Sequence, residues 1–130
     1  MNPQCEDVKT ILVNESIAQA DDIHLTRMPE SPDSVITVLD QPGSPPEHML
    51  WYYKPKVQVL VRGSRNSYKS TKSLANNVLT CLHTYGPWVT GDTNYVGIWA
   101  TSDVIFIGYD NSDRPVFSLN FLIHRSVRRI

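Results

Sequence analysis

The sequence has 130 residues, of which 41% are hydrophobic and 19% charged, with a formal net charge of −1. This length suits one domain that can bury its own core, and the ordinary composition excludes a low-complexity or disordered chain. No apolar run approaches the roughly 18 residues needed to cross a bilayer, and residues 1–7 lack the features of a signal peptide. We therefore expect a protein that is made in the cytosol, in which the widely separated Cys5 and Cys81 are reduced thiols.

The charges are distributed unevenly along the chain. Residues 1–50 carry nine acidic side chains against two basic ones, whereas residues 51–130 carry ten basic side chains against four acidic ones. Opposite charge on two parts of one domain suits head-to-tail contact between copies. The alternative is that both parts are ordinary solvated surface.

The first half of the chain predicts one helix and short extended segments. Apolar side chains at helical spacing predict a first helix over residues 4–21. Residues 23–25 are either a short strand or an extended connector, and two prolines make residues 29–33 a turn. Residues 35–39 read as a strand, and the Pro-Gly-Ser-Pro-Pro run at 42–46 is expected to be irregular.

A cluster of large side chains, Met-Leu-Trp-Tyr-Tyr, follows this loop at residues 49–53. Long loops in small domains are usually functional or mobile, and aromatic side chains are costly to leave in water. Either Trp51 and Tyr53 fold back onto their own core, or they contact a neighbouring subunit. Our candidates for contacts between subunits are Met49, Leu50, Trp51, Tyr52, Tyr53 and Arg62.

The centre of the predicted fold is a strand followed at once by a helix. In residues 55–63, Val57, Val59 and Val61 alternate with other side chains, which indicates a strand ended by glycine. A stripe of small and apolar residues then predicts an amphipathic helix from about residue 71, capped by Ser67 or Asn66 and stopped by Gly-Pro at 86–87. We expect the valine face of the strand to pack on this helix.

The remaining elements are strands joined by turns. Residues 88–89 and 95–99 flank a turn and predict a hairpin. Residues 104–109 are apolar on both faces, which predicts a well-buried strand, and residues 117–123 alternate as a final strand. The sequence thus predicts an α+β fold in a single domain of residues 1–130: a mostly antiparallel sheet of about five strands with two helices packed on it.

Signals for chemistry are weak. The four histidines, at positions 24, 48, 83 and 124, lie in different elements and lack the spacing of a zinc helix. There is no nucleophile-elbow motif, no phosphate-cradling loop and no complete calcium loop. We therefore predict no catalytic, cofactor-binding or metal-binding residue, and no enzyme activity.

Basic residues close the chain. Arg125, Arg128 and Arg129 are candidates for contact with DNA or with an acidic partner, because such groups neutralise phosphates without reading sequence. The chain as a whole is not basic, which argues against a dedicated nucleic-acid binder.

Four segments occur in an order that is similar to a known family: residues 31–40 (SPDSVITVLD), 43–46 (GSPP), 55–63 (PKVQVLVRG) and 108–121 (GYDNSDRPVFSLNF). Together they resemble the tail terminator or minor capsid proteins of long-tailed bacteriophages, over about the whole chain. The resemblance is structural in character, because none of these segments is a catalytic motif. Where the family usually has a glycine before the Arg-Pro pair, this chain has Asp113, which leaves the type of that turn open.

The resemblance implies a structural virion protein. It would form a ring, typically of six copies, at the head-proximal end of the tail tube, end tube polymerisation and join the tail to the head connector. The implied partners are other copies of the chain, the tail tube protein, the head–tail connector protein and, transiently and non-specifically, the DNA that passes through; no membrane is involved. The protein would be made in the host cytoplasm. The alternatives are another connector component, such as a head-completion or stopper protein, and a small cytosolic enzyme.

Overall fold

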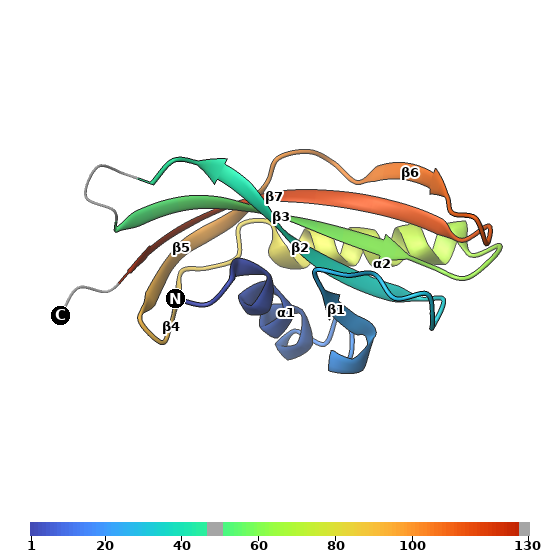
Figure 1. The fold of residues 1–130 in the computed structure, drawn as a ribbon, viewed down its shortest axis with the longest axis horizontal. Helices are drawn as coiled ribbons and strands as arrows, with labels where there is room; N and C mark the ends of the chain where they lie inside the picture. The colour runs from blue at the N-terminus through green and yellow to red at the C-terminus, as the bar shows by residue number, and fades with distance from the viewer. Residues whose placement is uncertain (47–50, 128–130) are drawn as a thin grey trace.

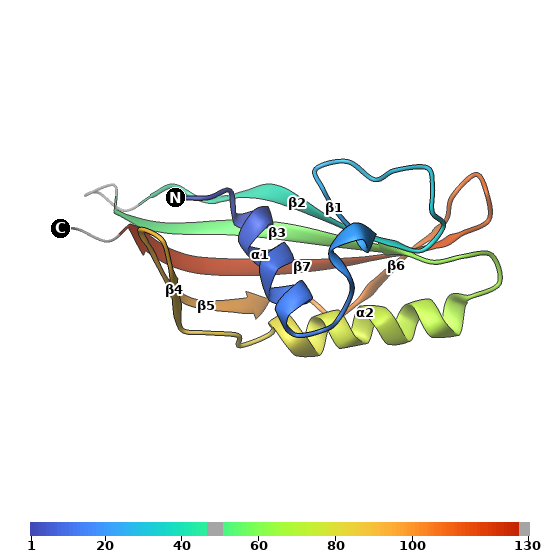
Figure 2. The ribbon, with the colours of Figure 1, turned by 90° about the horizontal axis from the view of Figure 1, so that it is seen from below.

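The computed structural model describes residues 1–46 and 51–127 (Figures 1 and 2). Its elements, in chain order, are α1 (Gln4–Asn14), the 3-10 turn η1 (Ala20–Asp22), β1 (Ile23–Leu25), β2 (Val35–Ser44), β3 (Tyr52–Arg62), α2 (Tyr68–Leu82), β4 (Trp88–Thr90), β5 (Thr93–Ala100), β6 (Ile105–Tyr109) and β7 (Pro115–Val127).

Seven strands form one mixed sheet in the order β1-β2-β3-β7-β5-β4, and β6 pairs with the first residues of β7. The prediction of an α+β fold with two helices is confirmed. The sheet, however, is larger than about five strands, and it is mixed, because β1 pairs parallel to β2 whereas the other strand pairings are antiparallel. A strand of three residues carries too little periodicity to be recognised, and the connection over residues 26–34 returns the chain for the parallel pairing.

The central strand and the helix after it form the core as predicted. Val57, Val59 and Val61 are fully buried, in one cluster with Ala75 and Val78 of α2. Apolar residues of α1 belong to the same cluster, so both helices lie against the face of the sheet that carries these valines (Figure 2). The packing of the valine face on α2 is therefore confirmed.

A glycine makes the close junction between β3 and α2 possible. A Cβ atom at Gly63 would lie 1.8 Å from the Thr71 Oγ1 atom, so any larger residue there would push the helix away. The helix begins after Ser67, one of the two predicted caps, and ends at Leu82. The C-cap residue His83 has an extended backbone, so the helix ends before the predicted Gly-Pro stop.

The first helix is shorter than predicted, because it ends at Asn14 and not at residue 21. Ser16 has a φ of 59°, and the Ile17 N–H donates to the Leu12 carbonyl over 3.0 Å. A left-handed residue with this hydrogen bond is a Schellman motif, which normally uses glycine. A serine in that position gives no stop signal in the sequence.

The Pro-Gly-Ser run after the first predicted strand is also more regular than expected. Strand β2 continues to Ser44, so the prediction of irregular structure is wrong for residues 42–44. The pairing of β2 with β3 shifts between Gln41 and Ser44, and a bulge of this kind accommodates proline. A Cβ at Gly43 would lie 1.8 Å from the Lys54 carbonyl oxygen, so only glycine fits at this bulge.

The prediction of a buried strand at residues 104–109 is wrong. Strand β6 pairs with β7 along one edge, and within residues 1–46 and 51–127 nothing pairs with its other edge. Helix α2 covers β7 but reaches only the rim of β6, where the rings of Tyr68 and Phe106 meet at 5.1 Å. Four large side chains of β6 are 40–58% exposed in consequence.

Candidate assembly surfaces

Arg62 anchors the loop between β1 and β2. Its side chain ends β3 and is only 3% exposed. The guanidinium donates to the carbonyl oxygens of Pro29, Pro32 and Asp33 over 2.7, 2.9 and 2.9 Å. Burial lowers the pKa of Arg62, and the nearby charge of Arg114 lowers it further. Because its donors are used within the chain, any role of Arg62 between subunits acts through the position of this loop.

Arg114 fixes the same end of the molecule with charges. It is buried, and it bonds the carboxylates of Asp110, Glu30 and Asp33 over 2.8, 3.0 and 3.2 Å. The pKa of Asp110 is lowered, first by the backbone N–H of Arg114 and then by that of Ser112. Burial opposes the charge of Arg114, but these carboxylates outweigh it and raise the pKa of the guanidinium. The turn before β7 and the loop after β1 are thus fixed to each other.

Arg125 is likewise turned into the chain. It donates to the Asn2 carbonyl over 2.9 Å, to the Tyr95 hydroxyl over 3.1 Å and to Gln4 Oε1 over 3.2 Å. The Tyr95 hydroxyl in turn donates to the Asp7 carboxylate. Burial and the hydrogen bond to Asp7 raise the pKa of Tyr95. Arg125 therefore holds the start of α1 on the sheet, whereas Arg128 and Arg129 lie outside the described residues.

The predicted aromatic cluster divides between the interior and the surface. Tyr52 begins β3, and its hydroxyl lies 2.9 Å from His124 Nδ1. Burial, then the charge of Lys54, lower the pKa of His124. Tyr53 is half-buried, and Trp51 remains 39% exposed with its ring edge-on to that of Tyr52. The candidates Met49 and Leu50 lie outside the described residues.

One end of the sheet carries exposed apolar side chains around the β4–β5 hairpin. A row of paired residues runs from Tyr52 on β3 through Ser126 and Asn94 to Val89 on β4, so these strand ends lie side by side. The N-terminal ammonium adjoins the hairpin turn through Asp92, 3.1 Å away. The exposed large apolar side chains here, which we call the hairpin patch, are Met1, Trp51, Val89 and Val96.

The other end carries the exposed strand β6 and the start of α2. Phe106 contacts the rings of Tyr68, Phe117 and Tyr109 at centroid distances of 5.1–5.4 Å, so the exposed rings form one ordered cluster. We call the exposed apolar side chains at this end the β6 patch: Tyr68, Ile105, Phe106, Ile107 and Tyr109. The sequence contained this signal, an apolar run on both faces of a strand, but the same run also describes a buried strand.

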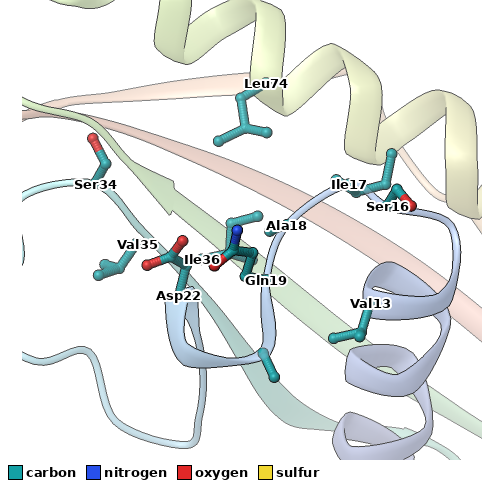
Figure 3. A pocket seen from close by; sticks show the side chains of 11 residues that line it. Val13, Ser16, Ile17, Ala18, Gln19, Asp22, Ser34, Val35, Ile36 and Leu74 are labelled. Atoms are coloured by element: carbon teal, nitrogen blue, oxygen red, sulfur yellow. The ribbon is translucent and has the colours of Figure 1, made fainter.

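The molecule also has a groove of about 770 Å³ between the end of α1, the start of β2 and α2 (Figure 3). Its walls include Val13 and Ile17 on one side, Val35 and Ile36 on another, and Leu74 of α2. Asp22 is the one ionisable side chain among its lining residues. The groove therefore offers packing surface without a convergent set of acids, bases or nucleophiles.

The described residues show no arrangement suited to metal chemistry. Among residues 1–46 and 51–127, no three His, Cys, Asp or Glu side chains come together as a possible metal site. Within the same part of the chain, no helix has the length and apolar character required to span a bilayer. The described surface thus carries two sets of exposed apolar side chains at the ends of the sheet and one groove lined mainly by apolar side chains.

Comparison with solved structures places the fold. A chain from a structure titled "Virion of native gene transfer agent (GTA) particle" matches with a TM-score of 0.69 and 13% identity, over 92% of this chain and 91% of that one. A second solved chain matches with a TM-score of 0.59 and 10% identity, over 96% of both chains. At these identities the likeness concerns the fold alone. No protein in a search of curated proteins matches the sequence.

The family is identified by a family model rather than by a close relative. The model of the bacteriophage tail terminator protein family matches residues 11–127, which is most of the chain. The chain belongs to the bacteriophage tail terminator family. It is accordingly a structural protein of the phage virion tail, as the resemblance in its sequence segments predicted.

Proposed function

We propose that six copies of this chain, each acting as a single domain, form a ring at the head-proximal end of the phage tail tube. The ring ends polymerisation of the tube protein and joins the tail to the head–tail connector. The observation that carries this proposal is the match of the tail terminator family to residues 11–127. The protein acts in this role without catalysis or cofactor.

The surfaces of the chain support an assembly role. A closed ring requires heterologous contacts, in which each copy presents two different patches. The hairpin patch and the β6 patch are two such surfaces on one chain. The solved chain with the TM-score of 0.69 comes from a structure whose title names a virion, which agrees with a place in a particle.

Among the candidate contact residues that the structure describes, Trp51 has the most exposed side chain. Its indole is 39% exposed, whereas Tyr52 and Tyr53 are half-buried. We expect Trp51→Ala to leave the unfolding midpoint nearly unchanged but to impair assembly of the ring on tails. The matched control is Tyr52→Phe, which removes a hydroxyl bonded to His124 within the chain. Normal tails with Trp51→Ala would remove Trp51 from the contact.

The basic tail is proposed to meet DNA or an acidic surface of a partner. Because Arg125 is bonded inside the chain, this proposal depends on Arg128 and Arg129. Replacing both with serine should reduce virion yield most strongly at low salt, where contacts with phosphates or carboxylates contribute most, and should make the yield less dependent on salt. An unchanged yield and unchanged salt sensitivity would contradict the proposal.

The decisive experiment removes the protein from an infection and images the tails. Without a terminator, tube polymerisation should continue, so that electron micrographs show tails of variable and excessive length without heads. Purified wild-type protein added during assembly should restore uniform tails, and a labelled copy should lie at the head-proximal tip. Tails of normal length with failed joining on the head side would instead indicate a head-completion or stopper protein.

A further inference from the structure

The exposed apolar side chains of the chain gather at two ends of one strand. Among the described residues, every exposed large hydrophobic side chain belongs to either the hairpin patch or the β6 patch. Strand β7 connects the two ends: Ser126 pairs beside the hairpin, and Val116 pairs with Gly108 of β6. Ten residues of strand separate these positions, which is about 33 Å. Figure 1 shows β6 and β4 at opposite ends of the elongated molecule.

We propose that the β6 patch of one copy docks on the hairpin patch of the next copy. This inference specifies the contact between neighbouring copies in the proposed ring. It rests on the proposed function only for the closure of the assembly into a ring. A single chain that carries both halves of a contact at opposite ends associates head to tail. Neither half is satisfied within its own chain, because the two lie too far apart to meet.

The size and composition of the β6 patch suit the centre of such a contact. Five side chains at 40–58% exposure present on the order of 500 Å² of apolar surface, near the upper range for the largest patch of a monomer. A standard interface covers about 800 Å² on each partner, with aromatic residues enriched at its centre. Three of the five residues are aromatic, and their rings already pack on one another.

Charged side chains at the rims of the two patches are compatible with a second copy as the occupant. Lys69 is exposed beside Tyr68, and Lys72 lies one helical turn further on the same face. The hairpin turn carries Asp92, whose side chain is 55% exposed. Basic side chains thus border the β6 patch, whereas at the hairpin patch Asp92 is paired with the N-terminal ammonium of its own chain, so a lysine of a second copy competes with that ammonium for the carboxylate.

The test uses one charged variant in each patch and a matched control. Ile107 and Val89 are each 57% exposed, so Ile107→Glu and Val89→Glu should fold with the wild-type thermal midpoint. Asn76→Glu adds the same charge on an exposed position of α2 outside both patches. Self-association is measured by sedimentation velocity up to the solubility limit.

The expected pattern is specific to a head-to-tail contact. Wild type and Asn76→Glu should form oligomers larger than dimers, and each patch variant should lose association by at least about a hundredfold, because a buried unpaired charge is costly. An equimolar mixture of Ile107→Glu and Val89→Glu should form dimers and nothing larger. Each such dimer joins the intact β6 patch of one variant to the intact hairpin patch of the other, and its two free ends are both blocked.

Other results overturn the inference. Loss of association in Ile107→Glu alone indicates a symmetric β6–β6 contact, and variants that associate normally but no longer bind tails assign the β6 patch to the tube protein. A wild-type chain that stays monomeric up to its solubility limit also excludes the contact. Imaging separates this inference from the proposed function: a chain at tail tips without head-to-tail association refutes the contact, whereas association of a chain absent from tail tips refutes the function.

Discussion

Replacing Arg62 with alanine should destabilise the fold by releasing the loop between β1 and β2. Three hydrogen bonds of 2.7–2.9 Å from the guanidinium to loop carbonyls disappear in this variant. A bond from a charged donor contributes about 1.5–3 kcal/mol, but the three do not add, because the exposed loop lets water reach the freed carbonyls. Removing a buried charge also returns its desolvation cost. We expect a net loss of about 2–3 kcal/mol in the free energy of unfolding.

Urea unfolding followed by tryptophan fluorescence measures this loss. With a slope of about 2 kcal/mol per molar urea, the midpoint should fall by roughly 1 M while the slope stays constant. Hydrogen exchange should accelerate in residues 26–34 and remain slow in the core. Arg62→Lys keeps the charge without the fork of donors, so it should lie between wild type and Arg62→Ala.

Arg65→Ala is the matched control for an arginine outside the core. The Arg65 side chain is 69% exposed and pairs with Asp113 over 3.1 Å, so its removal should cost at most about 0.5 kcal/mol. If Arg62→Ala unfolds at the same urea concentration as Arg65→Ala, the anchoring role is refuted. If Arg62→Ala is stable but fails to assemble on tails, the side chain acts directly between subunits.

Three further predictions follow from buried polar groups. Tyr95→Phe leaves the Asp7 carboxylate without the tyrosine hydroxyl and should lower the free energy of unfolding by about 2 kcal/mol, as urea midpoints will show. Burial and then the charge of Lys54 lower the pKa of His124 in the folded chain. The unfolded chain therefore binds more protons as the pH drops below the usual pKa of 6.5, so the thermal midpoint should decrease as the solution is acidified through this range. His124→Gln should make the midpoint less dependent on pH. Burial raises the pKa of the Cys5 thiol to about 11, which reduces its thiolate roughly a hundredfold, so thiol reagents should label it only on unfolding.

The central elements were predictable because their signals are local. The alternating valines of β3 and the helical stripe of α2 each repeat several times, and one glycine marks their junction. The end of α1 was not predictable, because Ser16 has the left-handed backbone conformation that ends the helix, and this position is normally occupied by glycine. The extension of β2 depends on the fit of Gly43 against the Lys54 carbonyl, a contact with a different strand.

The arginines show why the candidate surfaces were only partly predictable. Arg62 and Arg125 look like surface charges in the sequence, but each is buried and donates hydrogen bonds to groups distant along the chain. Backbone carbonyls are the main partners of Arg62. Because every residue has a backbone carbonyl, no residue type in the sequence marks these partners. Trp51, in contrast, was a candidate because of its size and its loop, and it does remain exposed.

Strand β6 raises a more general point about apolar patterns. An apolar run on both faces indicates that a strand will be buried, but it does not say which chain will cover it. Natural edge strands usually carry charged residues or proline, which prevent association, and β6 instead places isoleucine at positions 105 and 107. Burying about 500 Å² of such surface is worth on the order of 10 kcal/mol before the entropic cost of association is subtracted. An isolated chain gains nothing from exposing these side chains, so we expect them to be buried against a partner molecule.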